Sequence, residues 1–431
     1  MKMSVRLSCL AVLMLASWSF ASVAWTLATD SAGWSKRCGQ GAVVFNNELW
    51  VMGGLDSVLS SSTKGHLFND VWHSTDGTSW SLATDSAAWP RRVLPTCLVF
   101  GGKMWVIGGV TPGASPGTVT LANDVWSSTD GTQWTKATDS AGWHPRVGQA
   151  GVVFDSLMWV MGGADSFGPS GPTQKVNDVW NSSDGVNWTQ VTSSAGWSPR
   201  DGHAAVVFAG KMWVIGGEVS HGDSTDVWYS TNGVAWTKAT SQVVEGRAFF
   251  PVLPFEGNMW MTGGCGSFLP ICGDVWRSAD GSQWTEDTSH APWRARYGHA
   301  AAYFNNRMWV LGGCDSTAPR HDVWCSEAAG VAEGRASFET RAAALGARPN
   351  PFCGRTELAC ARNAAGPASI WIQDVSGRQI RTLVADNRTL GLANVVWDGR
   401  DCAGKDVPAG VYFALVSAGG RTDETMVVKL R

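Results

Sequence analysis

Residues 202–217 read "GHAAVVFAGKMWVIGG". Two apolar runs with the character of β-strands flank Ala209-Gly210, which suits a tight turn, and a glycine pair ends the second run. Four close copies and one looser copy of this stretch occur elsewhere in the chain. A hairpin that occurs six times predicts an all-β protein built from structural repeats.

Each copy is the first half of a longer repeat, whose period is 47 to 55 residues. An Asp-Val-Trp triplet follows every Gly-Gly pair, and in five of the six repeats a turn and another tryptophan come next, as in "STDGTSW" (residues 74–80). Asp-Gly predicts a two-residue hairpin, because both residues tolerate the positive φ that such a turn requires. Four strands in each repeat predict a β-propeller of six blades.

The sixth repeat is incomplete, because no fourth-strand tryptophan follows Asp322-Val323-Trp324. The segment "AWTLATDSAGW" (residues 24–34), which precedes the first full repeat, matches a fourth strand and the loop after it. We expect this N-terminal strand to complete the sixth blade and to close the ring, since an open ring would leave strand edges unpaired.

Tryptophan marks the repeat throughout: the chain has 26, and 23 of them occupy repeat positions. Such regular placement predicts packing between blades. The alternative is an aromatic platform for stacking sugars, which best suits the tryptophans in the loops between blades. These loop residues are Trp34, Trp89, Trp143, Trp197 and Trp293.

Composition and the N-terminus indicate an exported protein. Charged residues make up 16% of the 431 residues and the net charge is −3, without a basic stripe, so we expect no nucleic-acid partner. Residues 1–24 carry Lys2 and Arg6 before a short apolar run and small residues, which is typical of a signal peptide. No later segment is apolar enough for a transmembrane span. We expect a secreted or cell-surface protein.

Nine cysteines follow the predicted signal peptide, and export permits disulfides. Cys265 could pair with Cys272 in one loop, and Cys314 with Cys325 across another. Cys38 with Cys97, and two of Cys353, Cys360 and Cys402, are further pairs that spacing cannot decide. Because neither loop pair is accompanied by histidines or cysteines at zinc-site spacing, we expect no metal and no cofactor.

The Gly-Gly second strand, the downstream aromatic residue and the period near fifty resemble kelch repeats over about residues 25–330. The resemblance agrees with a six-bladed propeller over residues 25–327. The turns of the "STDGTSW" type are also similar to the Asp-boxes of sialidases, but one residue is missing between Asp and Gly.

The C-terminal part departs from the repeat. Residues 328–349 are rich in Ala and Gly and predict a linker, and residues 350–431 alternate like the strands of a small sandwich. Four motifs of this part resemble the immunoglobulin-like (Ig-like) domain of flagellar hook-capping proteins and the C-terminal sorting domains of type IX secretion cargo. They are "NPF" (350–352), "SGR" (376–378), "WDGR" (397–400) and "PAGVY" (408–412). The resemblance implies contact with export machinery or surface attachment, and a plain accessory domain is the alternative.

One face of the predicted propeller carries the variable loops. Between Gly-Gly and Asp-Val-Trp lie 15, 14 and 14 residues in repeats one to three, but 8, 9 and 8 in repeats four to six. The opposite face has only tight turns. Variable loops on a rigid scaffold are where recognition usually occurs, so we expect a binding surface with a raised wall over the first three blades.

The same face should carry one arginine from each repeat, eight residues before the first-strand aromatic residue. These candidate ligand-binding residues are Arg37, Arg92, Arg146, Arg200, Arg247 and Arg296. Six guanidinium groups would attract a carboxylate, sulfate or phosphate. Alternatively, they pair with the six aspartates that begin the third strands.

These patterns predict a non-catalytic binding protein that recognises a protein or a glycan. The alternative is a glycan-active enzyme with its site on the same face: a sialidase-like hydrolase using Glu245 and the adjacent Arg296 and Tyr297, or a kelch-type oxidase using His203 and His299. The two histidines share a repeat position with Gln40, Pro95, Gln149 and Phe250, which indicates drift within the repeat. A purely structural surface protein is the third hypothesis.

Overall fold

The computed structural model describes residues 22–57, 65–115, 118–168, 171–240, 245–266, 270–328, 343–348, 350, 352–362, 368–374, 378–387, 393–418 and 421–430. The predicted signal peptide lies outside these residues except for its last three positions, and so does most of the predicted linker. The chain forms two compact units, residues 1–332 and 333–431.

All named elements in the described residues are β-strands, which confirms the all-β prediction. Within the same residues, no helix is long and apolar enough to cross a membrane. The described repeats form six four-stranded antiparallel sheets, called sheets 1 to 6 in chain order. A short ribbon of β16 (Glu218–Val219) and β17 (Gly222–Asp223) adjoins sheet 4.

The strands of each sheet follow the repeat. Sheet 1 consists of β2 (Gly41–Phe45), β3 (Glu48–Met52), β4 (Val71–Ser74) and β5 (Ser81–Thr84). Sheet 2 consists of β6 (Thr96–Phe100), β7 (Lys103–Pro112), β8 (Val119–Ser128) and β9 (Thr135–Thr138). Sheet 3 consists of β10 (Ala150–Phe154), β11 (Leu157–Gly168), β12 (Gly171–Ser182) and β13 (Thr189–Thr192).

Sheets 4 to 6 repeat this order. Sheet 4 consists of β14 (Ala204–Phe208), β15 (Lys211–Ile215), β18 (Val227–Ser230) and β19 (Thr237–Thr240). Sheet 5 consists of β20 (Val252–Phe255), β21 (Asn258–Thr262), β22 (Val275–Ser278) and β23 (Thr285–Thr288). Sheet 6 consists of β24 (Ala300–Phe304), β25 (Arg307–Cys314), β26 (Pro319–Ser326) and β1 (Trp25–Thr29).

Strand β1 pairs with β26 in antiparallel register, with Trp25 opposite Ser326. The ring of Trp25 meets that of Trp293 edge to face, with 4.6 Å between the centroids. In sheets 1 to 4 the fourth-strand tryptophan makes the same contact with the preceding loop tryptophan, as Trp80 does with Trp34. Strand β1 therefore has in sheet 6 the place that β5 has in sheet 1.

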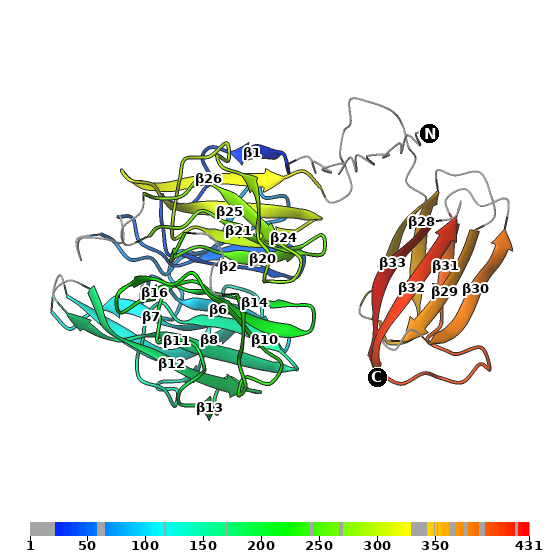
Figure 1. The fold of residues 1–431 in the computed structure, drawn as a ribbon, viewed down its shortest axis with the longest axis horizontal. Helices are drawn as coiled ribbons and strands as arrows, with labels where there is room; N and C mark the ends of the chain where they lie inside the picture. The colour runs from blue at the N-terminus through cyan, green and yellow to red at the C-terminus, as the bar shows by residue number, and fades with distance from the viewer. Residues whose placement is uncertain are drawn as a thin grey trace, which may run out of the picture. The chain divides into compact units, whose positions relative to one another are not determined.

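The sheets contact one another in a cycle through their first strands. Strand β2 touches β24 and β6, β10 touches β6 and β14, and β20 touches β14 and β24. In Figure 1, β1, β26 and β25 of sheet 6 lie on the opposite side of the unit from β11 and β12 of sheet 3. The innermost strand of each sheet is thus the first strand of its repeat.

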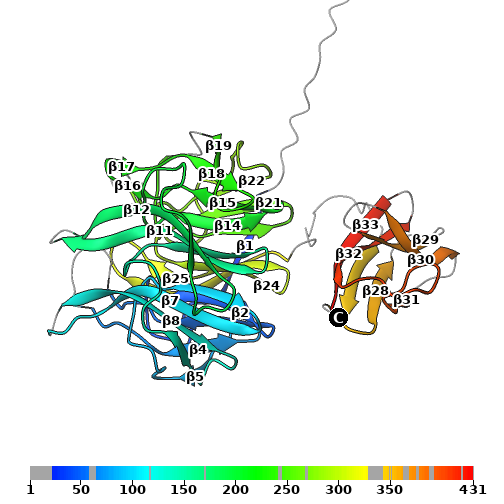
Figure 2. The ribbon, with the colours of Figure 1, turned by 90° about the horizontal axis from the view of Figure 1, so that it is seen from below.

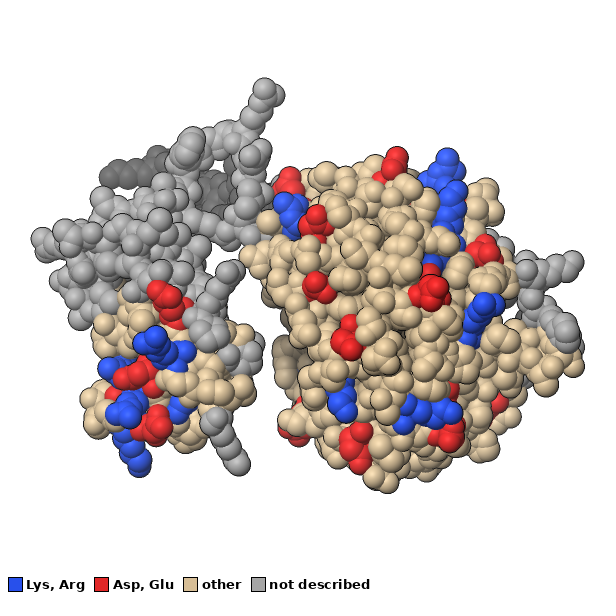
Figure 3. Space-filling model, turned by 180° about the vertical axis from the view of Figure 1, so that it is seen from behind, with Lys and Arg blue, Asp and Glu red and all other residues tan. Residues whose placement is uncertain are grey.

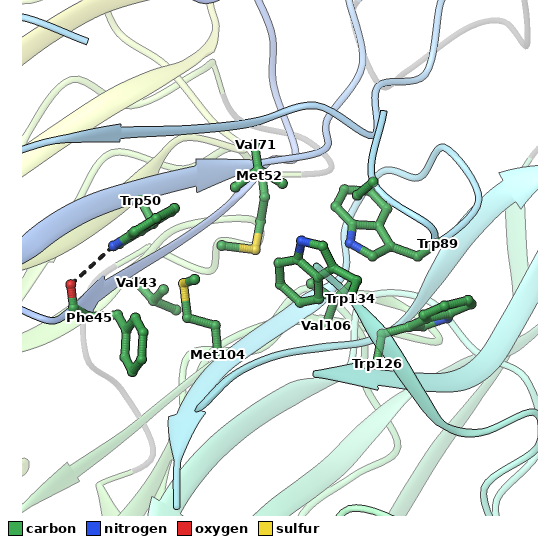
Figure 4. Close-up of a cluster of buried hydrophobic side chains, with 11 residues drawn as sticks. Val43, Phe45, Trp50, Met52, Val71, Trp89, Met104, Val106, Trp126 and Trp134 are labelled. Carbon is green, nitrogen blue, oxygen red and sulfur yellow. Dashed lines mark hydrogen bonds between the residues drawn. The ribbon is translucent and has the colours of Figure 1, made fainter. Parts of the chain in front are cut away.

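The first hairpin of each repeat is closed as its sequence predicts. In sheet 1, Asn46 and Asn47 both have positive φ, 50° and 61°, and the indole of Trp50 donates to the carbonyl oxygen of Phe45 at 3.0 Å. Beside this bond, Met52 and Met104 from adjacent sheets face one another in a buried cluster (Figure 4). Residues of neighbouring sheets therefore share each core.

The predicted two-residue Asp-Gly hairpin between third and fourth strands is wrong. Only the glycine has positive φ (76° at Gly77), and the loop runs over residues 75–80. The carboxylate of Asp76 accepts hydrogen bonds from the amides of Thr78 and Ser79, and these bonds organise the longer loop. A Cβ at Gly77 would lie 2.0 Å from the Trp309 ring of sheet 6, so this position requires glycine.

The five loop tryptophans are buried, with at most 4% of each side chain exposed, so the stacking-platform alternative is wrong for them. Each one lies inside a cluster that also holds strands of its neighbouring sheet. Trp89, for example, packs with Trp134 and Val106 of sheet 2 and with Met52 of sheet 1 (Figure 4). These residues hold the sheets together.

The second unit has two antiparallel sheets in its described residues. One consists of β27 (Ala343–Arg348), β28 (Thr356–Arg362) and β31 (Ala393–Trp397). The other consists of β29 (Ala368–Asp374), β30 (Gln379–Asn387), β32 (Gly410–Ala418) and β33 (Arg421–Lys429). Residues of both sheets, among them Leu358, Ile370 and Trp397, form one buried core.

Candidate functional site

The six arginines predicted as ligand-binding residues are buried against their own repeats. In sheet 3, Arg146 is 1% exposed, and its Nη1 donates to Gly162 O at 2.9 Å and to Asp178 Oδ1 at 2.6 Å. Its Nη2 donates to Asp178 Oδ2 at 2.9 Å. The indole of Trp180 donates to the same carboxylate oxygen at 2.8 Å. The guanidinium and the carboxylate thus satisfy each other.

The same pairing recurs in each of the other five repeats. The pairs are Arg37–Asp70, Arg92–Asp124, Arg200–Asp226, Arg247–Asp274 and Arg296–Asp322. Burial alone would raise the pKa of Asp124, but the hydrogen bonds and charge of Arg92 outweigh it and hold that pKa below its usual value. In the structure, each arginine therefore pairs with the aspartate of its own repeat, which is the alternative to a ligand-binding role.

Behind each arginine, the chain turns into the centre of the ring. The residue two positions after it has positive φ in every repeat: Gly39, Leu94, Gly148, Gly202, Phe249 and Gly298. At five of these positions, all but Gly148, the backbone amide donates to the equivalent carbonyl of the preceding repeat, and the bond from Gly39 N to Gly298 O, 2.8 Å, joins the first repeat to the sixth. Leu94 and Phe249 adopt φ of 54° and 56°, which strains a residue with a side chain.

A cavity of about 160 Å³ lies inside this ring of turns. Its wall includes Gln40, Gln149, His203 and His299, which share one repeat position and are buried. Neither ring nitrogen of His203 has a hydrogen-bond partner among the described residues. Burial lowers the pKa of His203 to about 3, and the charge of Arg200 acts in the same direction. A cavity of this size is smaller than most ligand pockets.

The C-terminal ends of the second strands and the N-terminal ends of the third strands form the variable-loop face, on the same side as the six arginines. Hairpin β7–β8 stays paired out to Pro112 and Val119, and hairpin β11–β12 out to Gly168 and Gly171. Both hairpins project beyond the sheets in the two views (Figures 1 and 2). The corresponding pair in sheet 6 already ends at Cys314 and Pro319. The wall is therefore built by sheets 2 and 3, and residues 58–64 of the first repeat lie outside the described part.

One charged cluster interrupts the repeat at the base of this wall. The Nζ of Lys175, on β12, lies 3.0 Å from Asp201 Oδ1 and 2.9 Å from Glu218 Oε1 of the fourth repeat. Asp201 is 1% exposed, whereas 41% of the Glu218 side chain is exposed. Burial raises the pKa of Asp201 to about 6, although the charge of Lys175 acts in the opposite direction.

Aligning the repeats by position would have revealed this cluster. The residue after the arginine is Cys38, Val93, Val147, Asp201, Ala248 and Tyr297 in turn. The residue after Gly-Gly is Leu55, Val110, Ala164, Glu218, Cys265 and Cys314. Only the fourth repeat has charged residues in these two positions, Asp201 and Glu218. In the structure their backbones form an antiparallel bridge.

The residues required by the sialidase-like alternative are engaged within their own repeat. Arg296 is engaged by Asp322, and Tyr297 is buried in a backbone pair with Cys314. His203 and His299, which the oxidase alternative requires, line the same central cavity from the fourth and the sixth repeat. On the surface of the first unit seen in Figure 3, lysines and arginines are interspersed with acidic residues rather than gathered in a field of one sign.

The predicted Cys314–Cys325 disulfide is incompatible with the strand register. Cys314 lies opposite Pro319, while Cys325 lies opposite Trp309, five residues away along β25. A disulfide requires the two Cα atoms within about 7 Å, which this separation does not allow. Cys265 and Cys272 are half-buried thiols in the structure, and their pairing stays a prediction.

Comparison with known proteins agrees with this geometry. A family model described as the KLHDC2/KLHL20/DRC7 Kelch-repeats domain matches residues 94–313. The solved structure of YjhT is similar with a TM-score of 0.53 at 15% sequence identity, and the match covers 67% of this chain and 94% of that chain. At this identity the similarity shows the fold alone. No curated protein matches the sequence.

Proposed function

The chain belongs to the kelch-repeat family, and from that premise we propose that residues 25–327 form a closed six-bladed propeller that binds a protein or a glycan through its variable-loop face. Strand β1 is the closing strand of the sixth blade in this proposal. The pairing of β1 with β26 and the cycle of contacts between first strands support it.

The observation that carries the binding role is the asymmetry between the two faces. One face has short connections of constant length, the two-residue first turns and the six-residue loops of the type 75–80, whereas on the other the hairpins β7–β8 and β11–β12 project and Lys175 links the second hairpin to sheet 4. Loops held on a rigid scaffold supply recognition at little conformational cost. The exposed carboxylate of Glu218 gives this face a charged group beside the wall.

The experiment screens the full chain against a glycan array and a peptide library, and then compares two matched charge removals. Glu218→Gln removes a charge from the loop face. Asp155→Asn removes one from a tight turn of the opposite face, and Asn46 and Asn305, which hold the same turn position in other repeats, show that asparagine fits there. We expect Glu218→Gln to weaken binding of the ligand found by about tenfold, as loss of a charged contact does, and Asp155→Asn to leave it unchanged. The reverse pattern would contradict the loop-face proposal.

A glycan-active enzyme is the second candidate, favoured by the pair Asp201 and Glu218. Glycoside hydrolysis uses two carboxyl groups whose pKa values differ, one as acid and one as base or nucleophile. Asp201 has the raised pKa and Glu218 is exposed at the loop face. The test is whether the natural chain hydrolyses a glycan that it binds. Loss of this hydrolysis in Asp201→Asn, with binding retained, would favour this candidate over a pure binding protein.

We further propose that residues 1–24 direct export and that residues 350–431, together with strand β27, form an Ig-like domain for passage across an outer membrane or for surface attachment. The motifs named above and the shared core of two antiparallel sheets support this proposal. Fractionation of cells that express the full chain, with and without residues 350–431, tests it. Equal distribution of both forms would contradict a role in export or attachment.

A further inference from the structure

Cys38 and Cys314 meet where sheet 1 adjoins sheet 6. Both are completely buried and belong to one cluster with Tyr297. The thiol of Cys38 lies 3.2 Å from the carbonyl oxygen of Ser57, and the thiol of Cys314 lies 3.7 Å from the same oxygen. These two distances place the sulfur atoms within 6.9 Å of each other.

The backbone brings the two cysteines together as it does their counterparts elsewhere in the ring. The amide of Gly313 donates to the carbonyl of Arg37 at 3.0 Å, and each cysteine is the next residue along its chain segment. At the junction of sheets 1 and 2, the amide of Gly54 donates to Arg92 at 2.8 Å in the same way. There the next residues are Leu55 and Val93, which pack in one buried cluster. The two positions therefore face each other across a junction.

We propose that Cys38 and Cys314 form a disulfide when the chain folds under oxidising conditions. One thiolate attacks a small-molecule disulfide such as oxidised glutathione, and one glutathione thiolate leaves. The second cysteine thiolate then attacks the protein sulfur of this mixed disulfide and releases the second glutathione. The protein thus loses two protons and two electrons and gains one S–S bond.

This bond would connect the first repeat to the last, next to the strand pairing of β1 with β26. A covalent link between residues so far apart in sequence restricts the unfolded chain strongly, so it should raise stability. It would also prevent the ring from opening at this junction. The inference is independent of what the loop face binds, because both cysteines are buried below that face.

The test is peptide mapping of the full chain after folding in a glutathione redox buffer, with alkylation of the remaining thiols. We expect a linked peptide pair containing Cys38 and Cys314, two hydrogen atoms lighter than the reduced pair. The midpoint of thermal unfolding should be higher by about 5 °C or more in the oxidised protein than after reduction. Alkylation of both cysteines in the oxidised protein, or a bond from either to Cys265, would overturn the proposal.

A matched pair of variants separates this bond from others. Val93 and Val147 occupy the position of Cys38 in the second and third repeats, so the variant Cys38→Val should fold. We expect it to lose the linked peptide pair and most of the redox dependence of the unfolding midpoint. Cys353→Ser, an exposed cysteine of the second unit, should keep both. A redox dependence in Cys38→Val as large as that of the natural chain would contradict the assignment.

Discussion

The folded chain is expected to lose stability steeply as the pH falls from about 6.5 to 4, because His203 and His299 are buried as neutral imidazoles. Burial, together with the charges of Arg200 and Arg296, lowers both pKa values from 6.5 to about 3. Between these values the unfolded chain binds protons that the folded chain does not, so the free energy of unfolding decreases as the pH falls. At pH 5 each histidine should cost about 2 kcal/mol.

The measurement is urea unfolding at pH 7.5 and pH 5 of the natural chain and of the double variant His203→Gln/His299→Gln. Gln40 and Gln149 show that glutamine fits this repeat position. The double variant should lose most of the difference between the two pH values, whereas the exposed control His144→Gln should keep it. An unchanged pH dependence in the double variant would show that the histidines are not its cause.

Asp201 acts in the opposite direction over part of this range. Its pKa in the folded chain is raised from 3.8 to about 6, so its contribution is fully present below 3.8 and is lost as the pH rises through 6. One raised carboxyl offsets part of the effect of two lowered imidazoles. The net change from pH 6.5 to 4 therefore remains a loss of stability.

Arg146→Ala is expected to reduce the free energy of unfolding by about 3–5 kcal/mol, because it leaves the buried Asp178 without its cation. It also removes the donor to Gly162 O. Urea unfolding at pH 7.5 measures the loss. Lys136→Ala, which removes the exposed ion pair with Asp139, is the control and should change stability by no more than about 1 kcal/mol.

The double variant Arg146→Ala/Asp178→Ala should recover part of the loss, since it removes the uncompensated carboxylate as well. Any ligand found in the screen should bind Arg146→Ala at temperatures where the variant is folded. A variant of natural stability that no longer binds the ligand would instead make Arg146 a ligand-binding residue.

The periodic features of the fold can be predicted from the sequence because they depend on local chemistry. The hairpin at Ala209-Gly210 and its copies follow from strand alternation and turn residues, and the Gly-Gly pairs and triplets fix where each repeat lies. The arginines stand out by their constant spacing. The sequence does not identify their partners, since spacing does not say whether a guanidinium group binds a ligand or the aspartate of its own repeat.

The errors arise where contacts depend on distant parts of the chain. The loop after Asp76 is longer than an Asp-Gly hairpin, and its glycine lies against Trp309 of sheet 6, a contact that the local sequence does not reveal. The Cys314–Cys325 pairing fails because strand register, rather than proximity in sequence, decides which residues face each other. Lys175 reaches Asp201 and Glu218 only because the long hairpin β11–β12 lies against the fourth repeat.

Hydrogen exchange of strand β1 in the full chain tests the central claim of a closed ring most directly. If Trp25–Thr29 completes the sixth blade, its amides bonded to β26 should exchange as slowly as those of β25 and β26, since they open only with the sheet. Exchange of β1 at the rate of an unstructured segment, while β24 to β26 stay protected, would contradict the closed ring and the loop-face site built on it.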